Sequence, residues 1–506
     1  MTDTVVARDV RHYEAPGVSG APRLAGLPGV DRVDGPGEQT LESFCHDTED
    51  LRLARAGVSV QRELDHPGWH WMLRREGEPP LEVPADDGSD AVPAAVLELV
   101  RTHTRGRELV AVAHTQRTRS VWQLLDWEGG HLGEITGDAV SAQTLGATTT
   151  VDSWYEVRID IAGPNATGRL LPALEERLVD IGATPATPAP VIARLLPVAP
   201  TRSPREPAPV GKKSRAGKVV LSAITAQVAR FEKHDPLVRR DEPDAVHQMR
   251  VATRQLRSML RTFGAVVDRD ATRRLTDELK WLAGALGAAR DQEVIQERVE
   301  ALVAATPPEN VLGPITAQLT QQFAREQTEA HAHVVAELDT DRYFALRDAL
   351  DVLLAAPPIT PLARKRASTA LPPLVRKTIR KVDKAVDVAR RVPAGTERAE
   401  ALHTVRKTAK RVRYAAELAT PVVGKKAART GKRFKAVQTV LGDHQDAVQT
   451  RAFLRALGAR GHLAGQNGFT AGIWYEQEAA AAADVDAAFE DTWRRAAARK
   501  HRKWLS

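Results

Sequence analysis

The sequence of 506 residues predicts a two-domain α+β protein, with antiparallel strands in its N-terminal part and a duplicated helical bundle in its C-terminal part. Three observations support this prediction. Short strand-like runs come first, helical periodicity follows, and a Pro-rich stretch separates the two. A pattern of basic residues then occurs twice in the helical part. We therefore place the domains at 1–196 and 215–506, joined by a linker at 197–214.

The N-terminal part contains several short runs of β-branched and aromatic residues between turns. In the clearest run, residues 154–161, apolar side chains at 155, 157, 159 and 161 alternate with charged ones. Antiparallel strands with charges on one face can line a polar barrel interior or face water. The segment 169–181 is expected to form an amphipathic helix, and 86–102 to hold another.

The linker is where the charge of the chain changes sign. It contains five prolines, which exclude a helix interior or a central strand. Residues 1–200 hold 18 arginines, no lysine and 30 acidic residues, a net charge of −12. Residues 201–506 hold 54 lysines and arginines and 35 acidic residues, a net charge of +19. Halves of opposite charge predict two domains with different functions.

The repeated basic pattern places one histidine and three cations at offsets of 0, 3, 7 and 10, on one face of a helix. The two copies are His247, Arg250, Arg254 and Arg257, and then His403, Arg406, Lys410 and Arg413. Lys280 and Lys435 follow the copies, each seven residues before a glycine. A period of roughly 156 residues is too long for a solenoid and predicts a duplicated bundle. Its repeats would span about 215–345 and 362–506.

A third basic helix is expected to begin at the pair Pro372 and Pro373, because proline suits the first turn of a helix. It contains Arg376, Arg380 and three lysines within about two and a half turns. Together with the two copies of the pattern and with Lys280 and Lys435, these two arginines are our candidate residues for binding an anion.

The two helix faces carry only positive charge, and this favours an anionic partner over a face that is simply exposed to water. We call these faces the basic stripes. Residues 246–263 and 402–416 contain no Asp or Glu, although acidic neighbours would relieve the repulsion between like charges. At the head of each stripe, His247 and His403 are interpreted as phosphate contacts, with a structural role as the alternative. Metal ligation is disfavoured because few carboxylates share the face. Asp291 and Asp446 are expected to be salt-bridge partners or caps.

Composition excludes several classes of function. Cys45 is the only cysteine, so neither an internal disulfide nor a multi-thiol metal site can form. The first residues lack a signal-peptide pattern, and no apolar run approaches the ~20 residues that span a membrane. We therefore expect a cytoplasmic protein without a membrane partner.

The basic repeats resemble the CHAD domain, the conserved histidine α-helical domain. The resemblance rests on residues 246–258, on Leu286-Gly287-Ala288-Ala289-Arg290-Asp291, and on the second set around His403 and Asp446, and it covers about 290 residues. It implies two four-helix bundles related by a pseudo-twofold axis, a basic central surface and binding of inorganic polyphosphate.

The N-terminal part resembles the CYTH domain, a triphosphate-tunnel β-barrel, through residues 47–53, 57–62, 69–73, 133–135, 138–140 and 154–156. This resemblance implies an antiparallel β-barrel over roughly residues 5–196. Active members begin with a Glu-x-Glu-x-Lys strand that holds a divalent metal, whereas this chain has neither Glu nor Lys at residues 6–12. Met72 stands where a lysine is usual, and Arg158 where an acid is usual. Catalysis is therefore expected to be lost.

The favoured function is binding of inorganic polyphosphate by the helical domain, with no cofactor required. The first alternative is a metal-dependent triphosphatase in the barrel, which would need Mg²⁺ or Mn²⁺. A residual triphosphate site would use Arg62, Glu82, Arg117, Arg119, Glu134 and Glu156. The second alternative is a nucleic-acid-binding protein, disfavoured because the stripes lack interleaved aromatic residues for stacking.

Overall fold

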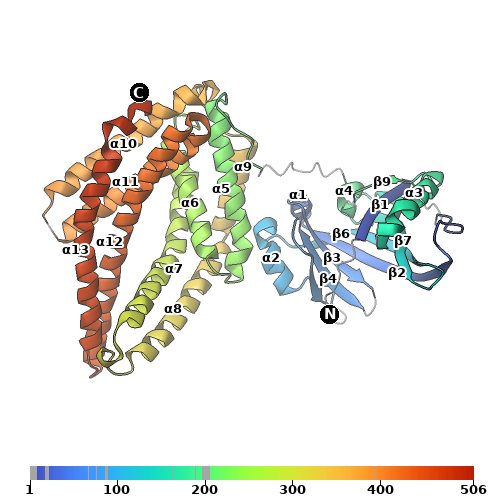
Figure 1. The fold of residues 1–506 in the computed structure, drawn as a ribbon, viewed down its shortest axis with the longest axis horizontal. Helices are drawn as coiled ribbons and strands as arrows, with labels where there is room; N and C mark the ends of the chain where they lie inside the picture. Colours follow the sequence, from blue (N-terminus) through green and yellow to red (C-terminus); the bar gives the residue numbers. More distant parts are fainter. Residues whose placement is uncertain are drawn as a thin grey trace. The chain divides into compact units, whose positions relative to one another are not determined.

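In the computed structural model, the chain forms two compact units, Met1–Ser203 and Pro204–Ser506 (Figure 1). The structure describes residues 8–16, 22–65, 68–75, 77–85, 89–162, 164–187, 190–196, 206–393 and 395–505. Residues 197–205 of the expected linker, and the start of the first strand at Val6 and Ala7, lie outside these residues. Each unit buries hydrophobic cores of its own.

The N-terminal unit is built on one antiparallel sheet with the strand order β5-β4-β3-β2-β6-β7-β8-β1-β9. Within the described residues no pairing joins β5 to β9, so the sheet is open and its closure into a barrel stays a prediction. The strands are β1 (Arg8–Pro16), β2 (Arg32–Asp47), β3 (Val58–Leu64), β4 (Trp69–Arg75), β5 (Leu81–Pro84), β6 (Val110–Leu125), β7 (His131–Thr144), β8 (Val151–Ala162) and β9 (Thr184–Pro185).

The alternation predicted for residues 154–161 is confirmed in β8. Tyr155, Val157, Ile159 and Ile161 are buried, and they pack against leucines of α3 (Pro164–Asp180), which includes most of the expected helix 169–181. The second expected helix is α2 (Ala94–Thr104), which packs on β3 and β4. Two short helices complete the unit, α1 (Arg52–Arg55) and α4 (Val191–Leu195). The charged face of β8 is thereby left on the opposite side of the sheet.

The C-terminal unit is helical, as predicted. Among the described residues, no helix is both long and apolar enough to cross a bilayer. The helices are α5 (Ala216–Arg239), α6 (Ala245–Thr262), α7 (Arg273–Ala305), α8 (Ile315–Leu338), α9 (Asp341–Ala355), α10 (Ala367–Arg391), α11 (Thr396–Val423), α12 (Lys425–Leu463) and α13 (Phe469–Ala497), with short 3₁₀ turns η1 (Pro308–Asn310), η2 (Pro361–Arg364), η3 (Arg499–His501) and η4 (Lys503–Leu505).

Helices α5–α8 and α10–α13 form the two repeats, and α9 connects them (Figure 1). Reciprocal hydrogen bonds join the repeats where α5 and α10 begin. The amide of Ala216 donates to the carbonyl of Lys365 over 2.9 Å, and that of Ala367 donates to Ser214 over 3.0 Å. One core contains side chains from both repeats. A second core ties α7 and α8 to α12 and α13 through residues such as Phe323 and Trp474.

The third basic helix begins earlier than expected. Helix α10 starts at Ala367, so Pro372 and Pro373 lie inside it rather than at its first turn. Proline at these positions removes two backbone hydrogen-bond donors. Burial of Ala367, Ala370 and Leu371 in the shared core stabilises the additional first turn. Tertiary packing therefore overrides the local preference of proline for a helix start.

Candidate functional site

Helices α6 and α11 pack against each other between the repeats and bring the two predicted stripes together. Their apolar sides, for example Leu256 and Val412, belong to the shared core, so the cations occupy a different face. The charges of Arg250, Arg254 and Arg406 all act on Lys410. We call these four residues the central cation cluster. The structure thus joins the middle of both stripes into one group.

Charge in the central cation cluster is poorly compensated. In the described part of the chain, Arg254 and Lys410 form no ion pair or hydrogen bond with a carboxylate. Burial, followed by the neighbouring guanidinium groups, lowers the pKa of Lys410 to about 6. Burial also lowers the pKa of Arg254, and the charge of Arg250 adds to this effect. A bound anion would relieve both the repulsion and the loss of solvation.

In each repeat, a glycine and an aspartate lie beside one arginine of the cluster, which is Arg250 in the first repeat and Arg406 in the second. Arg250 forms an ion pair with Asp291 at 2.9 Å, and Arg406 with Asp446 at 3.9 Å, which confirms the expected salt-bridge partners. A Cβ atom added at Gly442 would lie 3.2 Å from a terminal nitrogen of Arg406. The Leu-Gly step therefore lets α12 lie close to this guanidinium group.

The two histidines lie at the head of the stripes, partly buried. The Nδ1 atom of each is buried and has no hydrogen-bond partner among the described residues. Burial and then the charge of Arg290 lower the pKa of His247, while burial and then Lys407 lower that of His403. Both rings are therefore weaker bases than an exposed histidine. An adjacent phosphate would favour protonation.

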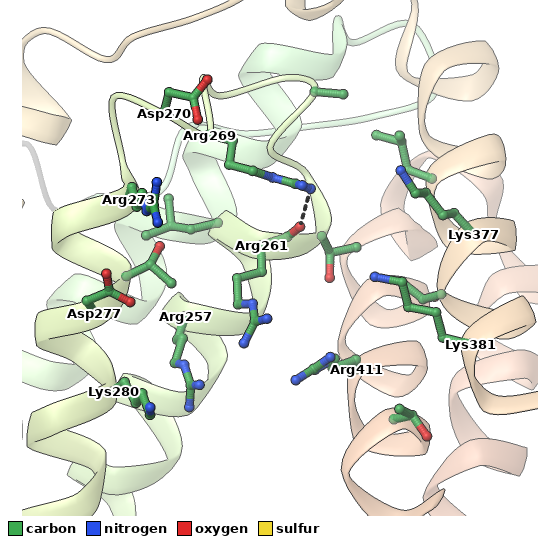
Figure 2. Close-up of a pocket in the computed structure, with 17 residues that line it drawn as sticks. Arg257, Arg261, Arg269, Asp270, Arg273, Asp277, Lys280, Lys377, Lys381 and Arg411 are labelled. Atoms are coloured by element: carbon green, nitrogen blue, oxygen red, sulfur yellow. Dashed lines mark hydrogen bonds between the residues drawn. The ribbon is translucent and has the colours of Figure 1, made fainter. Parts of the chain in front are cut away.

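Next to the central cluster, α6, α7, α10 and α11 enclose a pocket of about 490 Å³, which we call the basic pocket (Figure 2). Of the predicted residues, Arg257 and Lys280 line it. Figure 2 shows Arg261 and Arg411 facing each other across it. Six lining cations were missed by the sequence analysis as site residues, namely Arg261, Arg269, Arg273, Lys377, Lys381 and Arg411. Only two carboxylates, Asp270 and Asp277, accompany these eight cations.

Signals for some of the missed residues are present in the sequence. Arg261 continues the first stripe by one further helical step, four residues after Arg257. Lys377 and Lys381 belong to the third basic helix, in which Arg376 and Arg380 are the predicted site residues. Those two arginines are exposed and do not line the pocket. The periodicity of α10 does not indicate which of its basic faces meets α6.

The cations of the basic pocket repel one another. Burial, followed by the charge of Arg261, lowers the pKa of both Arg257 and Arg411. Burial lowers the pKa of Lys381, and then Arg411 and other nearby cations lower it further. A guanidinium nitrogen of Arg269 donates to the backbone carbonyl of Arg261 over 3.3 Å. The pocket is thus a confined positive field that a polyanion would neutralise.

The remaining residues predicted for the helical unit lie elsewhere. Arg413 forms an ion pair with Glu417 at 3.1 Å and donates to the side-chain oxygen of Gln438 over 2.9 Å. Its guanidinium group also stacks on the ring of Tyr414, 4.7 Å from the centroid. Lys435 is exposed on α12 and does not line the basic pocket. The end of the second stripe is therefore separated from the basic pocket.

In the N-terminal unit, a pocket of about 300 Å³ lies on the charged face of β1, β6, β7 and β8. It contains four of the six predicted residues, namely Arg117, Arg119, Glu134 and Glu156. Arg62 instead pairs with Asp90 and stacks on Trp69, and Glu82 is exposed on β5. The structure thus brings most, but not all, of the expected residual site together.

The carboxylates of this N-terminal pocket are already engaged. Asp138 accepts two hydrogen bonds of 2.8 Å from Arg119 and lies 3.5 Å from Arg117. Glu156 accepts from the indole of Trp154 over 2.6 Å, and Glu134 accepts from Gln123 over 2.7 Å. No group of three or more potential metal ligands occurs among the residues that the structure describes. The arrangement is therefore a network of protein ion pairs.

Comparisons with known proteins agree with the helical architecture. The family model of the CHAD domain matches residues 222–455. Two Mycobacterium tuberculosis proteins, Uncharacterized protein MT2285 (strain CDC 1551 / Oshkosh) and Uncharacterized protein Rv2226 (strain ATCC 25618 / H37Rv), are each 32% identical over 475 residues. Each alignment covers 91% of this chain and 90% of the relative. The chain carries a CHAD domain and belongs to the family of these two proteins.

Two solved structures resemble part of the chain. PptA from Streptomyces chartreusis is 21% identical, with a TM-score of 0.47, over 56% of this chain and 100% of that chain. The CHAD domain from the plant Ricinus communis is 24% identical, with a TM-score of 0.45, over 57% of this chain and 94% of that chain. Both similarities cover little more than half of this chain.

Proposed function

We propose that the helical unit binds inorganic polyphosphate through the central cation cluster and the basic pocket. The observation that carries this proposal is that eight cations but only two carboxylates line one pocket. Beside it, Arg254 and Lys410 have no acidic partner in the described part of the chain. An uncompensated positive field of this kind attracts a polyanion. A linear chain of phosphates carries negative charge on every unit, which suits a row of cations.

The binding mode follows from the chemistry of the side chains. An arginine can hold two oxygens of one phosphate group, whereas a lysine acts as a compact point charge. Because phosphate binding releases counterions, affinity should fall steeply as the salt concentration rises. No covalent step is needed for such binding.

Nucleic acid is the second alternative as polyanionic partner. Single-stranded nucleic acids use aromatic side chains as stacking platforms, yet none of the residues that line the basic pocket is aromatic. Competition separates the two ligands. We expect long polyphosphate to displace a nucleic acid at a far lower phosphate concentration than the nucleic acid needs to displace polyphosphate.

The direct test is a titration of the full chain with long polyphosphate, followed by fluorescence anisotropy at several salt concentrations. The variant Arg250→Ala/Arg254→Ala/Arg406→Ala/Lys410→Ala should lose affinity at least about a hundredfold. Its slope of log affinity against log salt should fall by about 3, since each lost phosphate contact contributes about 0.7–0.9.

The matched control is Arg325→Ala/Arg455→Ala/Arg460→Ala/Arg495→Ala, which removes the same number of basic residues from exposed positions on α8, α12 and α13. This control should bind within about twofold of wild type, because exposed charges far from the ligand are largely screened. Equal losses in both quadruple variants would show that net charge, rather than the proposed site, governs binding.

For the N-terminal unit, we propose a CYTH-like domain that has lost catalysis. Supporting this, the carboxylates that could face a metal accept hydrogen bonds from arginine, glutamine and tryptophan side chains instead. Divalent metals need free carboxylate oxygens for phosphoryl chemistry. The alternative, a metal-dependent triphosphatase, requires Glu156 or Glu82 to act, so alanine at either position would then abolish phosphate release.

A further inference from the structure

The two repeats correspond residue by residue around the basic pocket. The reciprocal hydrogen bonds of Ala216 and Ala367 align α5 with α10 at a spacing of 151 residues. His247 and His403 align α6 with α11 at a spacing of 156 residues. The basic pocket draws lining residues from α6, α7, α10 and α11, so a symmetric arrangement of the repeats places an equivalent at α11, α12, α5 and α6.

That equivalent exists as a separate pocket of about 310 Å³, which we call the mate pocket. Seven of its thirteen lining residues, all on α5, α6 and α11, match those of the basic pocket at the expected spacings, and none of the thirteen comes from α12. Ala223, Ala226 and Gln227 on α5 correspond to Leu374, Lys377 and Thr378 on α10. On α11, Glu417, Leu418 and Pro421 correspond to Arg261, Thr262 and Ala265 on α6. The two pockets are thus related by the duplication.

At three of these equivalent positions, a cation of the basic pocket is replaced by a neutral or acidic residue in the mate pocket. Where the basic pocket has Lys377, the mate pocket has Ala226. Gln255 takes the place of Arg411, and Glu417 takes the place of Arg261. No cation lines the mate pocket in the described part of the chain, and its one charged residue, Glu417, is acidic. A phosphate chain would meet no attraction there.

Two further features make the mate pocket less suited to a phosphate chain. Pro207 and Val210, which precede α5, line the mate pocket, and the hydroxyl of Ser222 donates to the carbonyl of Ala208 over 2.8 Å. The segment is therefore held against α5. In addition, Glu417 pairs with Arg413, the residue that corresponds to Arg257 of the basic pocket. A cation that could have bound phosphate is thus used within the protein.

We propose that this chain binds polyphosphate on one side only, as a single phosphate chain that extends from the central cation cluster into the basic pocket and never into the mate pocket. This inference rests on the proposed function and adds direction and stoichiometry to it. The duplicated fold keeps two equivalent positions, but only one of them retains the charge that a polyanion needs.

Pseudo-equivalent double variants of the full chain test this inference. Arg257→Ala/Lys280→Ala removes two cations from the basic pocket, and Arg413→Ala/Lys435→Ala removes the corresponding two from the mate side. Long polyphosphate should bind the first variant about tenfold or more weakly, because two charge-assisted contacts are lost. It should bind the second within about twofold of wild type, since Arg413 is already paired with Glu417 and Lys435 is exposed to solvent, where its charge is screened.

A third variant, Lys377→Ala/Arg411→Gln, guards against misfolding, because it installs residues that the chain itself uses at the equivalent positions. It should match the loss of the first variant, while its circular dichroism and melting temperature stay close to wild type. Calorimetry with a short polyphosphate should give one bound chain per protein.

Equal losses from the basic-pocket and mate-side variants, or two chains bound per protein with similar affinity, would overturn one-sided binding and leave the proposed function standing. Wild-type protein that binds no polyphosphate would overturn both.

Discussion

Lys410 lies among Arg250, Arg254 and Arg406, and burial together with these charges lowers its pKa to about 6. Most of the Lys410 side chains in the free protein are therefore neutral at pH 8. A nearby phosphate favours the charged ammonium form and raises this pKa. Binding of polyphosphate should then take up a proton, so affinity should decrease as the pH rises above about 6. A group that released a proton on binding would give the opposite dependence, with affinity rising as the pH rises.

Proton uptake can be measured directly. Calorimetric titrations of polyphosphate at pH 8, in buffers with different ionisation enthalpies, should reveal a net uptake that approaches one proton per protein. His247 and His403 also have lowered pKa values, so they contribute mainly at lower pH. In the variant Lys410→Arg the side chain at this position is already protonated before binding, so the variant should take up almost no proton at pH 8. Unchanged uptake in this variant would assign the proton to another group.

At the scale of single elements, a glycine in each of helices α7 and α12 leaves room for a guanidinium group of the central cluster. A Cβ atom at Gly442 would lie 3.2 Å from a terminal nitrogen of Arg406, closer than an ordinary contact. At Gly287 the corresponding distance to Arg250 is 3.8 Å, which is ordinary van der Waals contact. The two equivalent glycines therefore differ in how much side chain they tolerate.

Substitutions at these glycines should separate stability from binding. Gly287→Ala should stabilise α7 by about 0.5–1 kcal/mol and leave polyphosphate affinity unchanged, because alanine favours the helix. Gly442→Val should push Arg406 out of position and weaken binding by about tenfold, a cost of about 1.4 kcal/mol. Denaturant unfolding and anisotropy titrations measure the two effects. Equal affinity of Gly442→Val and wild type would show that Arg406 does not need this position.

Across the whole molecule, the charge and the chemistry of the two units differ. Residues 1–200 carry a net charge of −12, and residues 201–506 a net charge of +19. The N-terminal pocket combines arginines with carboxylates that neutralise them, whereas the basic pocket leaves most of its cations uncompensated. The first arrangement favours a stable protein network, and the second favours an external polyanion. This contrast supports the proposal that the helical unit, rather than the N-terminal unit, binds phosphate.

This division predicts the outcome of an activity assay on the full chain. Inorganic triphosphate incubated with Mg²⁺ or Mn²⁺ should release no phosphate above the background without protein, because the carboxylates of the N-terminal pocket are already engaged. Phosphate release that disappears in Glu156→Ala would instead support the triphosphatase alternative. An active CYTH-type enzyme assayed in parallel serves as the positive control.

Much of the helical site follows from local sequence. Helical offsets placed Arg250 and Arg254 on one face, and the repeat indicated that Arg406 and Lys410 belong to an equivalent helix. The apolar alternation of residues 154–161 likewise predicted the buried face of β8. These features depend on the period of a single helix or strand, which a sequence contains directly.

By itself, the sequence determined the two-domain organisation, the duplication, the reversal of charge and the stripes of cations. Only the tertiary structure decided which cations meet. It placed Lys377 and Lys381 in the lining of the basic pocket and Arg376 and Arg380 outside it, although all four are exposed on one basic helix. It also paired Arg413 with Glu417, so that residues with equal positions in the repeat have unequal surroundings. The physical reason is that the rotation and approach of neighbouring helices depend on side-chain packing across the whole core, which no single helical period specifies.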